Sequence, residues 1–123
     1  MLEGQRILVV EDEMMVLMAI EDMLADLGCT SVSAASSVAK ALDMIASEPF
    51  DLVTLDLNLS GTRSYPVARL LVERGIPFAF STGYGEHGIE EFSGRPVLSK
   101  PYSAAQFGAV MSGLIATPAP LAP

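Results

Sequence analysis

The sequence predicts an α/β fold in which helices cover both faces of a doubly wound, five-stranded parallel sheet, in the pattern (βα)5. Two observations support this prediction. Short apolar segments alternate five times with amphipathic stretches along the 123 residues. Most of these segments are continuously apolar, as strands covered on both faces are. Half of the residues are hydrophobic, which suffices for one domain with its own core.

Five segments are predicted to be strands. In chain order they are residues 7–10, 30–34, 51–55, 77–81 and 96–98. The second is the most polar, and the fifth begins with Pro96, which has no N–H to donate to a sheet. We therefore expect these two strands at the edges.

The first two predicted helices have clear boundary signals. The first shows apolar residues at helical spacing from Val16 onward, and Gly28 stands where a C-cap belongs. The second is expected to begin at Ser36 or Ser37, both good N-caps, and to end at Pro49.

The later helices differ in how clearly the sequence marks them. Pro66 lies in the first turn of the third helix, and Gly75 follows its last turn. Residues 83–94 contain four glycines and a brief helical pattern, so a short or mobile helix is predicted there. The last helix opens with a capping box formed by Ser103 and Gln106.

Composition and charge exclude several classes of protein. Fifteen acidic against seven basic residues give a net charge of −8, which disfavours nucleic acid and anionic membranes as partners. One cysteine and one histidine exclude an intrachain disulfide and a zinc site. Residues 1–13 do not have the pattern of a signal peptide and no apolar run has the length of a membrane span, so a cytoplasmic location is expected. Residues 1–116 are expected to form the domain, and the proline-rich residues 117–123 a disordered tail.

Polar residues follow four of the predicted strands. Glu11 and Asp12 follow the first strand, Asp56 the third, Thr82 the fourth and Lys100 the fifth. In a parallel sheet these strand ends share one edge, where ligands bind. Clustered carboxylates repel one another, and Mg²⁺, which prefers oxygen ligands, relieves the repulsion. With a lysine and a hydroxyl beside them, the carboxylates suit a phosphoryl group carried on a carboxylate oxygen.

These residues resemble the receiver domain of two-component response regulators. The motifs that carry the resemblance are LVVEDE at residues 8–13, DLVTLDLNL at 51–59, STG at 81–83 and SKP at 99–101. Each motif alone is weak, but their order and spacing cover residues 6–116. The resemblance implies a flavodoxin-like strand order of 2-1-3-4-5.

The resemblance also implies a role for each site residue. Asp56 corresponds to the phosphoryl acceptor, Thr82 to a hydroxyl that hydrogen-bonds the phosphoryl group, and Lys100 to the family's lysine. Together with Asp56, the implied Mg²⁺ ligands are Asp12 directly, Glu11 through water and the backbone carbonyl of Asn58.

Glu13 has a simpler interpretation, as part of an acidic first helical turn that the helix dipole favours. The family's peptide bond before the next proline is usually cis, which would be the Lys100–Pro101 bond here.

The chain departs from the family pattern at several positions. Val97 stands where the family usually carries an aromatic switch residue, and Ser60 with Gly61 stands where a Pro-Gly pair is usual. Residues 77–85, PFAFSTGYG, partly resemble the FAT GUY subgroup, with Ser81 in place of its alanine. That subgroup includes stand-alone receivers linked to bacterial stress signalling, so the resemblance implies a role in the bacterial stress response.

The predicted function is a single-domain response regulator. It would accept a phosphoryl group from a histidine kinase or phosphotransfer protein and act by docking to a downstream protein, as a shuttle or as a phosphate sink. It would catalyse only its own phosphorylation and dephosphorylation, and so would not be an enzyme.

Three alternatives belong to other classes. A receiver-fold interaction module would lack phosphotransfer. A haloacid-dehalogenase-like phosphatase needs a second aspartate where Asn58 stands. A flavin carrier needs a phosphate loop where the first acids stand.

Overall fold

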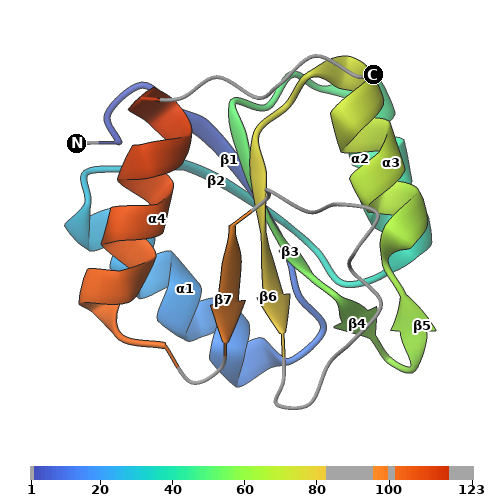
Figure 1. Ribbon diagram of the computed structural model, residues 1–123, viewed down its shortest axis with the longest axis horizontal. Helices are drawn as coiled ribbons and strands as arrows, with labels where there is room; N and C mark the ends of the chain where they lie inside the picture. The colour runs from blue at the N-terminus through green and yellow to red at the C-terminus, as the bar shows by residue number, and fades with distance from the viewer. Residues whose placement is uncertain (1, 83–95, 100–101, 117–123) are drawn as a thin grey trace.

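The computed structural model describes residues 2–82, 96–99 and 102–116. Within these residues the main sheet has five parallel strands in the order β2-β1-β3-β6-β7 (Figure 1). Strands β6 and β7 are the predicted fourth and fifth strands, so the predicted fold and the strand order 2-1-3-4-5 are confirmed. Its strands are β1 (Arg6–Val10), β2 (Ser31–Ala35), β3 (Leu52–Asp56), β6 (Phe78–Thr82) and β7 (Val97–Ser99).

The strand boundaries differ slightly from the predicted ones. Four strands begin and end one residue later than expected, and two of the residues left out are Pro77 and Pro96, which have no N–H to donate. As a result Asp56 and Thr82 are the last residues of their strands rather than the first residues beyond them.

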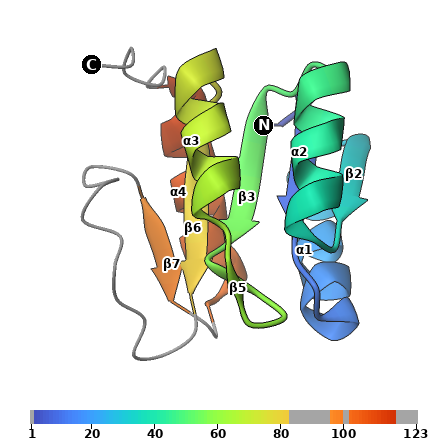
Figure 2. The same cartoon turned by 90° about the vertical axis from the view of Figure 1, so that its right-hand side faces the viewer.

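Four helices are described. They are α1 (Met14–Asp26), α2 (Val38–Ser47), α3 (Tyr65–Arg74) and α4 (Ala104–Ala116). Helices α1 and α4 cover one face of the sheet, and α2 and α3 cover the other (Figures 1 and 2). The helix expected within residues 83–94 lies outside the described residues, as do the 117–123 tail and the Lys100–Pro101 bond.

Several predicted caps are confirmed at the atomic level. The Ser37 hydroxyl accepts from the N–H of Lys40 at 3.1 Å, so Ser37 is the N-cap of α2. In the capping box of α4, the side chain of Gln106 accepts from the N–H of Ser103 at 2.8 Å, and the Ser103 hydroxyl accepts from the N–H of Gln106 at 3.1 Å. Gly75 ends α3 in a left-handed conformation, with φ at 69°.

The sheet separates two hydrophobic cores. Alternate residues of each strand point to opposite faces, so Val53 and Leu55 of β3 pack beneath α2 and α3, while Leu52 packs beneath α1 and α4. The second core also contains the thiol of Cys29, which is 6% exposed. Because Asp56 lies four residues after Leu52, its side chain belongs to the face that α1 and α4 cover.

One element was not predicted from the sequence. After β3 the chain forms a small antiparallel hairpin of β4 (Asn58–Leu59) and β5 (Thr62–Arg63) before α3 begins. This hairpin lies at the same edge of the sheet as the predicted site (Figure 1). Among the described helices, none has the length and apolar character needed to cross a membrane.

Candidate functional site

Three acidic residues meet at the C-terminal edge of the sheet. Glu11 and Asp12 follow β1, and Asp56 ends the neighbouring strand β3. One carboxylate oxygen from each lies within 4.8 Å of those of the other two. The structure therefore brings together three of the residues that the sequence singled out.

The sheet register explains why these side chains converge. Val10 pairs with Leu55 and Asp56 pairs with Ser81, so Glu11, Asp56 and Ser81 follow one another across the sheet on one face. Glu11 is 2% exposed and Asp56 is 5% exposed. Two buried carboxylates this close repel strongly unless a cation or a proton compensates their charge.

The loop after β3 orients Asp56 through its backbone. The N–H of Asn58 donates to Oδ1 of Asp56 at 3.2 Å, which holds the carboxylate toward the loop. The buried hydroxyl of Ser64 donates to the carbonyl oxygen of Asp56 at 2.7 Å. The exposed Asn58 begins β4, two residues after the acid, and its backbone carbonyl was expected to serve as a metal ligand.

Ser60 contacts the site although it was not expected to take part in it. Its N–H and its hydroxyl both donate to Oδ2 of Asp12, each at 2.8 Å. Ser60 and Gly61 form the turn between β4 and β5, at the position where the family usually carries a Pro-Gly pair. However, the sequence offered no sign that this turn would reach a residue 48 positions earlier.

Three further residues named in the sequence analysis are Thr82, Glu13 and Lys100. Thr82 ends β6, one residue beyond the partner of Asp56, and it is buried. Glu13 is exposed and lies outside the three-acid cluster, and its N–H donates to Oε2 of Glu11 at 3.3 Å. Lys100 lies outside the described residues.

The acidic cluster has the composition of a site for a hard cation. All three side chains offer carboxylate oxygens, and the described residues at this point contribute no nitrogen or sulfur ligand to the cluster. Mg²⁺ takes oxygen ligands, commonly one or two carboxylates together with water. Its charge would offset the repulsion between the buried carboxylates.

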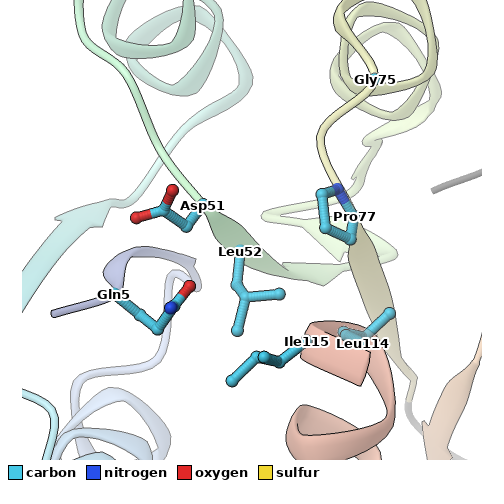
Figure 3. A pocket seen from close by; sticks show the side chains of 7 residues that line it. All are labelled: Gln5, Asp51, Leu52, Gly75, Pro77, Leu114 and Ile115. Carbon is cyan, nitrogen blue, oxygen red and sulfur yellow. The ribbon is translucent and has the colours of Figure 1, made fainter. Parts of the chain in front are cut away.

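A hollow lies at the opposite end of the sheet from the acidic cluster. Its lining includes Gln5, Asp51 and Pro77, together with Leu114 and Ile115 near the end of α4. Figure 3 shows Gln5 and Asp51 on one side and Pro77 and Leu114 on the other. The carboxylate of Asp51 already accepts from the N–H of Arg6 at 2.7 Å. We therefore assign the chemistry to the acidic edge.

Solved structures of known proteins share this architecture. The solution structure of SdrG from Sphingomonas melonis Fr1 is similar, with 38% identity, a TM-score of 0.82 and coverage of 90% of this chain and 96% of that one. The receiver domain of the sensor histidine kinase PA1611 from Pseudomonas aeruginosa PAO1 has 25% identity, a TM-score of 0.81 and coverage of 93% and 99%. That structure is described with a magnesium ion coordinated in its active-site cleft.

A third structure supports the fold alone. The PhyR receiver domain of Erythrobacter litoralis has 21% identity and a TM-score of 0.84, with coverage of 99% of this chain and 98% of that one. No curated protein matches the chain.

A family model supplies the remaining comparison. The model of the response regulator receiver domain matches residues 7–109, a span that contains the acidic cluster, the hairpin and, apart from Arg6, every residue of the main sheet's strands. With the parallel sheet, its strand order and the carboxylates at its edge, this match shows that the chain belongs to the response regulator receiver domain family.

Proposed function

We propose that this receiver domain accepts a phosphoryl group on Asp56 in a reaction that requires Mg²⁺. The observation that supports the proposal most directly is the cluster of three carboxylates within 4.8 Å, two of them buried. A buried carboxylate pair is costly to stability, so its presence at a strand-end edge points to a function that uses the charge.

The proposed reaction forms one bond and breaks another. A carboxylate oxygen of Asp56 attacks the phosphorus atom, and the bond from phosphorus to the donor's histidine nitrogen breaks. The hydrogen bond from the N–H of Asn58 to Oδ1 of Asp56 restricts the rotation of the attacking carboxylate. Bound Mg²⁺ would neutralise charge on the transferring phosphoryl oxygens.

Other residues would assist through the positions that the family resemblance assigns to them. Asp12 would bind the metal directly, Glu11 through water and Asn58 through its backbone carbonyl. Thr82 would donate to the phosphoryl group, and Lys100 would pair with it. Burial of Thr82 beside the strand pair of Asp56 and Ser81 supports its part in this proposal.

The proposed phosphoryl donor is a histidine kinase or a phosphotransfer protein. Such a donor must approach Asp56 closely, so its surface must cover the rim of the site. Met14 and Met15, which open α1 directly after the acids that follow β1, are strongly exposed, at 73% and 84%, and Met18, one turn further along the helix, is 56% exposed. Exposed, flexible methionines suit a protein contact surface.

After phosphorylation the domain would signal by altered docking to a partner, or would pass on or drain phosphoryl groups. We propose that it works in the cytoplasm. The partial FAT GUY signature of residues 77–85 supports a role in stress signalling. Nucleic acid and membranes are not proposed as partners, because the chain carries a net charge of −8.

Intact-protein mass spectrometry tests the proposal. Incubation with acetyl phosphate and Mg²⁺ is expected to add one phosphoryl group to the wild-type protein. Asp56→Asn is expected to abolish the adduct, because an amide oxygen is a poor nucleophile. Glu13→Gln is the matched control and is expected to retain the adduct, because Glu13 lies outside the cluster.

Two outcomes would contradict this assignment. An adduct that persists in Asp56→Asn would mean that another residue is the acceptor. No adduct in the wild-type protein, from acetyl phosphate or from a panel of histidine kinases, would favour an interaction module without phosphotransfer.

A further inference from the structure

We propose that Ser60 is a positioning residue, which holds the carboxylate of Asp12 in the orientation that binds the metal. This inference rests on the proposed function, in which Asp12 is a metal ligand. Its direct support is the pair of hydrogen bonds from the N–H and the hydroxyl of Ser60 to Oδ2 of Asp12, both 2.8 Å long.

The backbone of the hairpin makes this double contact possible. Ser60 and Gly61 connect β4 to β5 and have φ angles of 51° and 86°. Positive φ at both central residues is the pattern of a type I′ turn, which suits a two-residue hairpin connection. In this conformation the amide and the hydroxyl of Ser60 both reach Asp12. A proline at this position would have no N–H to donate.

The hairpin is anchored on the protein, so its tip offers a fixed point of attachment. The side chain of Leu59 is 2% exposed and packs in the core beneath α2 and α3. At the other end, the N–H of Ser64 donates to the carbonyl oxygen of Leu57 at 2.9 Å, and its hydroxyl donates to the carbonyl oxygen of Asp56 at 2.7 Å. One short segment therefore contacts both Asp12 and Asp56.

This attachment matters because Asp12 is less enclosed than its neighbours. Its burial is intermediate, whereas Glu11 and Asp56 are buried. A partly exposed aspartate samples several rotamers, and binding a metal would require one of them. A carboxylate has about four lone-pair sites, so it can accept from Ser60 and bind a cation at the same time. Partners that orient a metal ligand are commonly worth about 10- to 100-fold in metal affinity.

The first test measures Mg²⁺ affinity by NMR titration of backbone amide shifts. Ser60→Gly removes the hydroxyl and leaves the N–H, and glycine adopts positive φ without strain. We expect the dissociation constant for Mg²⁺ to rise about tenfold, the lower end of the usual range, because one hydrogen bond remains. Ser60→Asn is expected to restore part of the affinity, since asparagine suits a type I′ turn and supplies a side-chain donor.

Thr62→Ala is the matched control, because it removes a hydroxyl from the same exposed hairpin. It is expected to leave Mg²⁺ affinity unchanged. If Ser60→Gly binds Mg²⁺ as tightly as the wild-type protein does, or more tightly, Ser60 does not position the ligand and the inference is wrong. A wild-type protein that shows no Mg²⁺ binding would instead contradict the proposed function.

The second test uses hydrogen exchange in the metal-free protein. If the N–H of Ser60 donates to Asp12, the substitution Asp12→Ala should speed the exchange of that amide by at least tenfold. The amide of Ser64 is the internal control, because its acceptor is the carbonyl oxygen of Leu57. Equal exchange of the Ser60 amide in both proteins would overturn the proposed contact.

Discussion

Buried hydroxyl groups on β3 and β6 illustrate how single residues contribute to this domain. Thr54 is 1% exposed and Ser81 is 2% exposed, and neither hydroxyl has a hydrogen-bond partner among the described residues. A buried hydroxyl without a partner costs stability because it has lost its hydrogen bonds to water. Both side chains lie on the face of the sheet that also carries Asp56.

We therefore expect Thr54→Val to raise the free energy of unfolding by about 1 kcal/mol, because valine keeps the shape and removes the hydroxyl. Thr54→Ser is the reciprocal control, and it should lower the same quantity by about 1 kcal/mol through loss of a buried methyl group. Urea denaturation measures both changes. A Thr54→Val protein less stable than the wild type would show that the hydroxyl is hydrogen-bonded in solution.

Residue types at strand ends were predictable from the sequence, but contacts between loops were not. Asp12 and Asp56 stood out because acids after neighbouring parallel strands must share an edge. Ser60 did not stand out, because its contact with Asp12 depends on the shape of a hairpin 48 residues later in the chain. The roles of Thr82 and Lys100 came from the family resemblance and remain proposals.

Helix α2 begins after two adjacent serines, Ser36 and Ser37. The sequence left Ser36 and Ser37 as equal candidates for its N-cap, because either serine can accept from an amide of the first turn. The hydroxyl of Ser37 accepts from the N–H of Lys40, so Ser37 is the N-cap.

Ser37→Ala is expected to lower the free energy of unfolding by about 1 kcal/mol, because it leaves a helix N–H without its acceptor. Ser36→Ala should leave that free energy unchanged within the error of the measurement. Thermal or urea denaturation of the two variants distinguishes them. Equal losses in both would mean that the helix can shift its cap from one serine to the other.

The shortest strands could not be predicted from sequence patterns. The strands β4 and β5 have two residues each, too few to show alternation of polar and apolar residues. By contrast, the five longer strands stood out as short apolar segments and the four described helices as amphipathic stretches. Each predicted strand boundary lies within one residue of the observed one.

The acidic edge would couple the stability of the entire domain to the binding of a divalent cation. The chain has a net charge of −8, and three carboxylates lie within 4.8 Å of one another. A cation that binds the folded state and not the unfolded chain shifts the equilibrium toward folding by mass action. We infer that Mg²⁺ stabilises the entire domain.

The midpoint of thermal unfolding is therefore expected to rise with Mg²⁺ concentration. At 100 times the dissociation constant, the gain in free energy of unfolding is about 2.7 kcal/mol. Asp12→Asn should remove most of this gain, and NaCl at matched ionic strength should not reproduce it. An equal rise in Asp12→Asn would indicate general screening of the net negative charge rather than binding at the site.

The buried thiol of Cys29 has a practical consequence for following this domain in action. It is the single cysteine in the chain, it is 6% exposed, and its thiol lies 3.7 Å from the carbonyl oxygen of Gln5 and 3.6 Å from that of Ser31. A maleimide dye would therefore react with an introduced surface cysteine long before it reached Cys29. In a Thr62→Cys variant, a single fluorophore would therefore be attached to the hairpin. Changes in its emission would measure changes around the hairpin and Asp12 in real time, as Mg²⁺ or a phosphodonor is added.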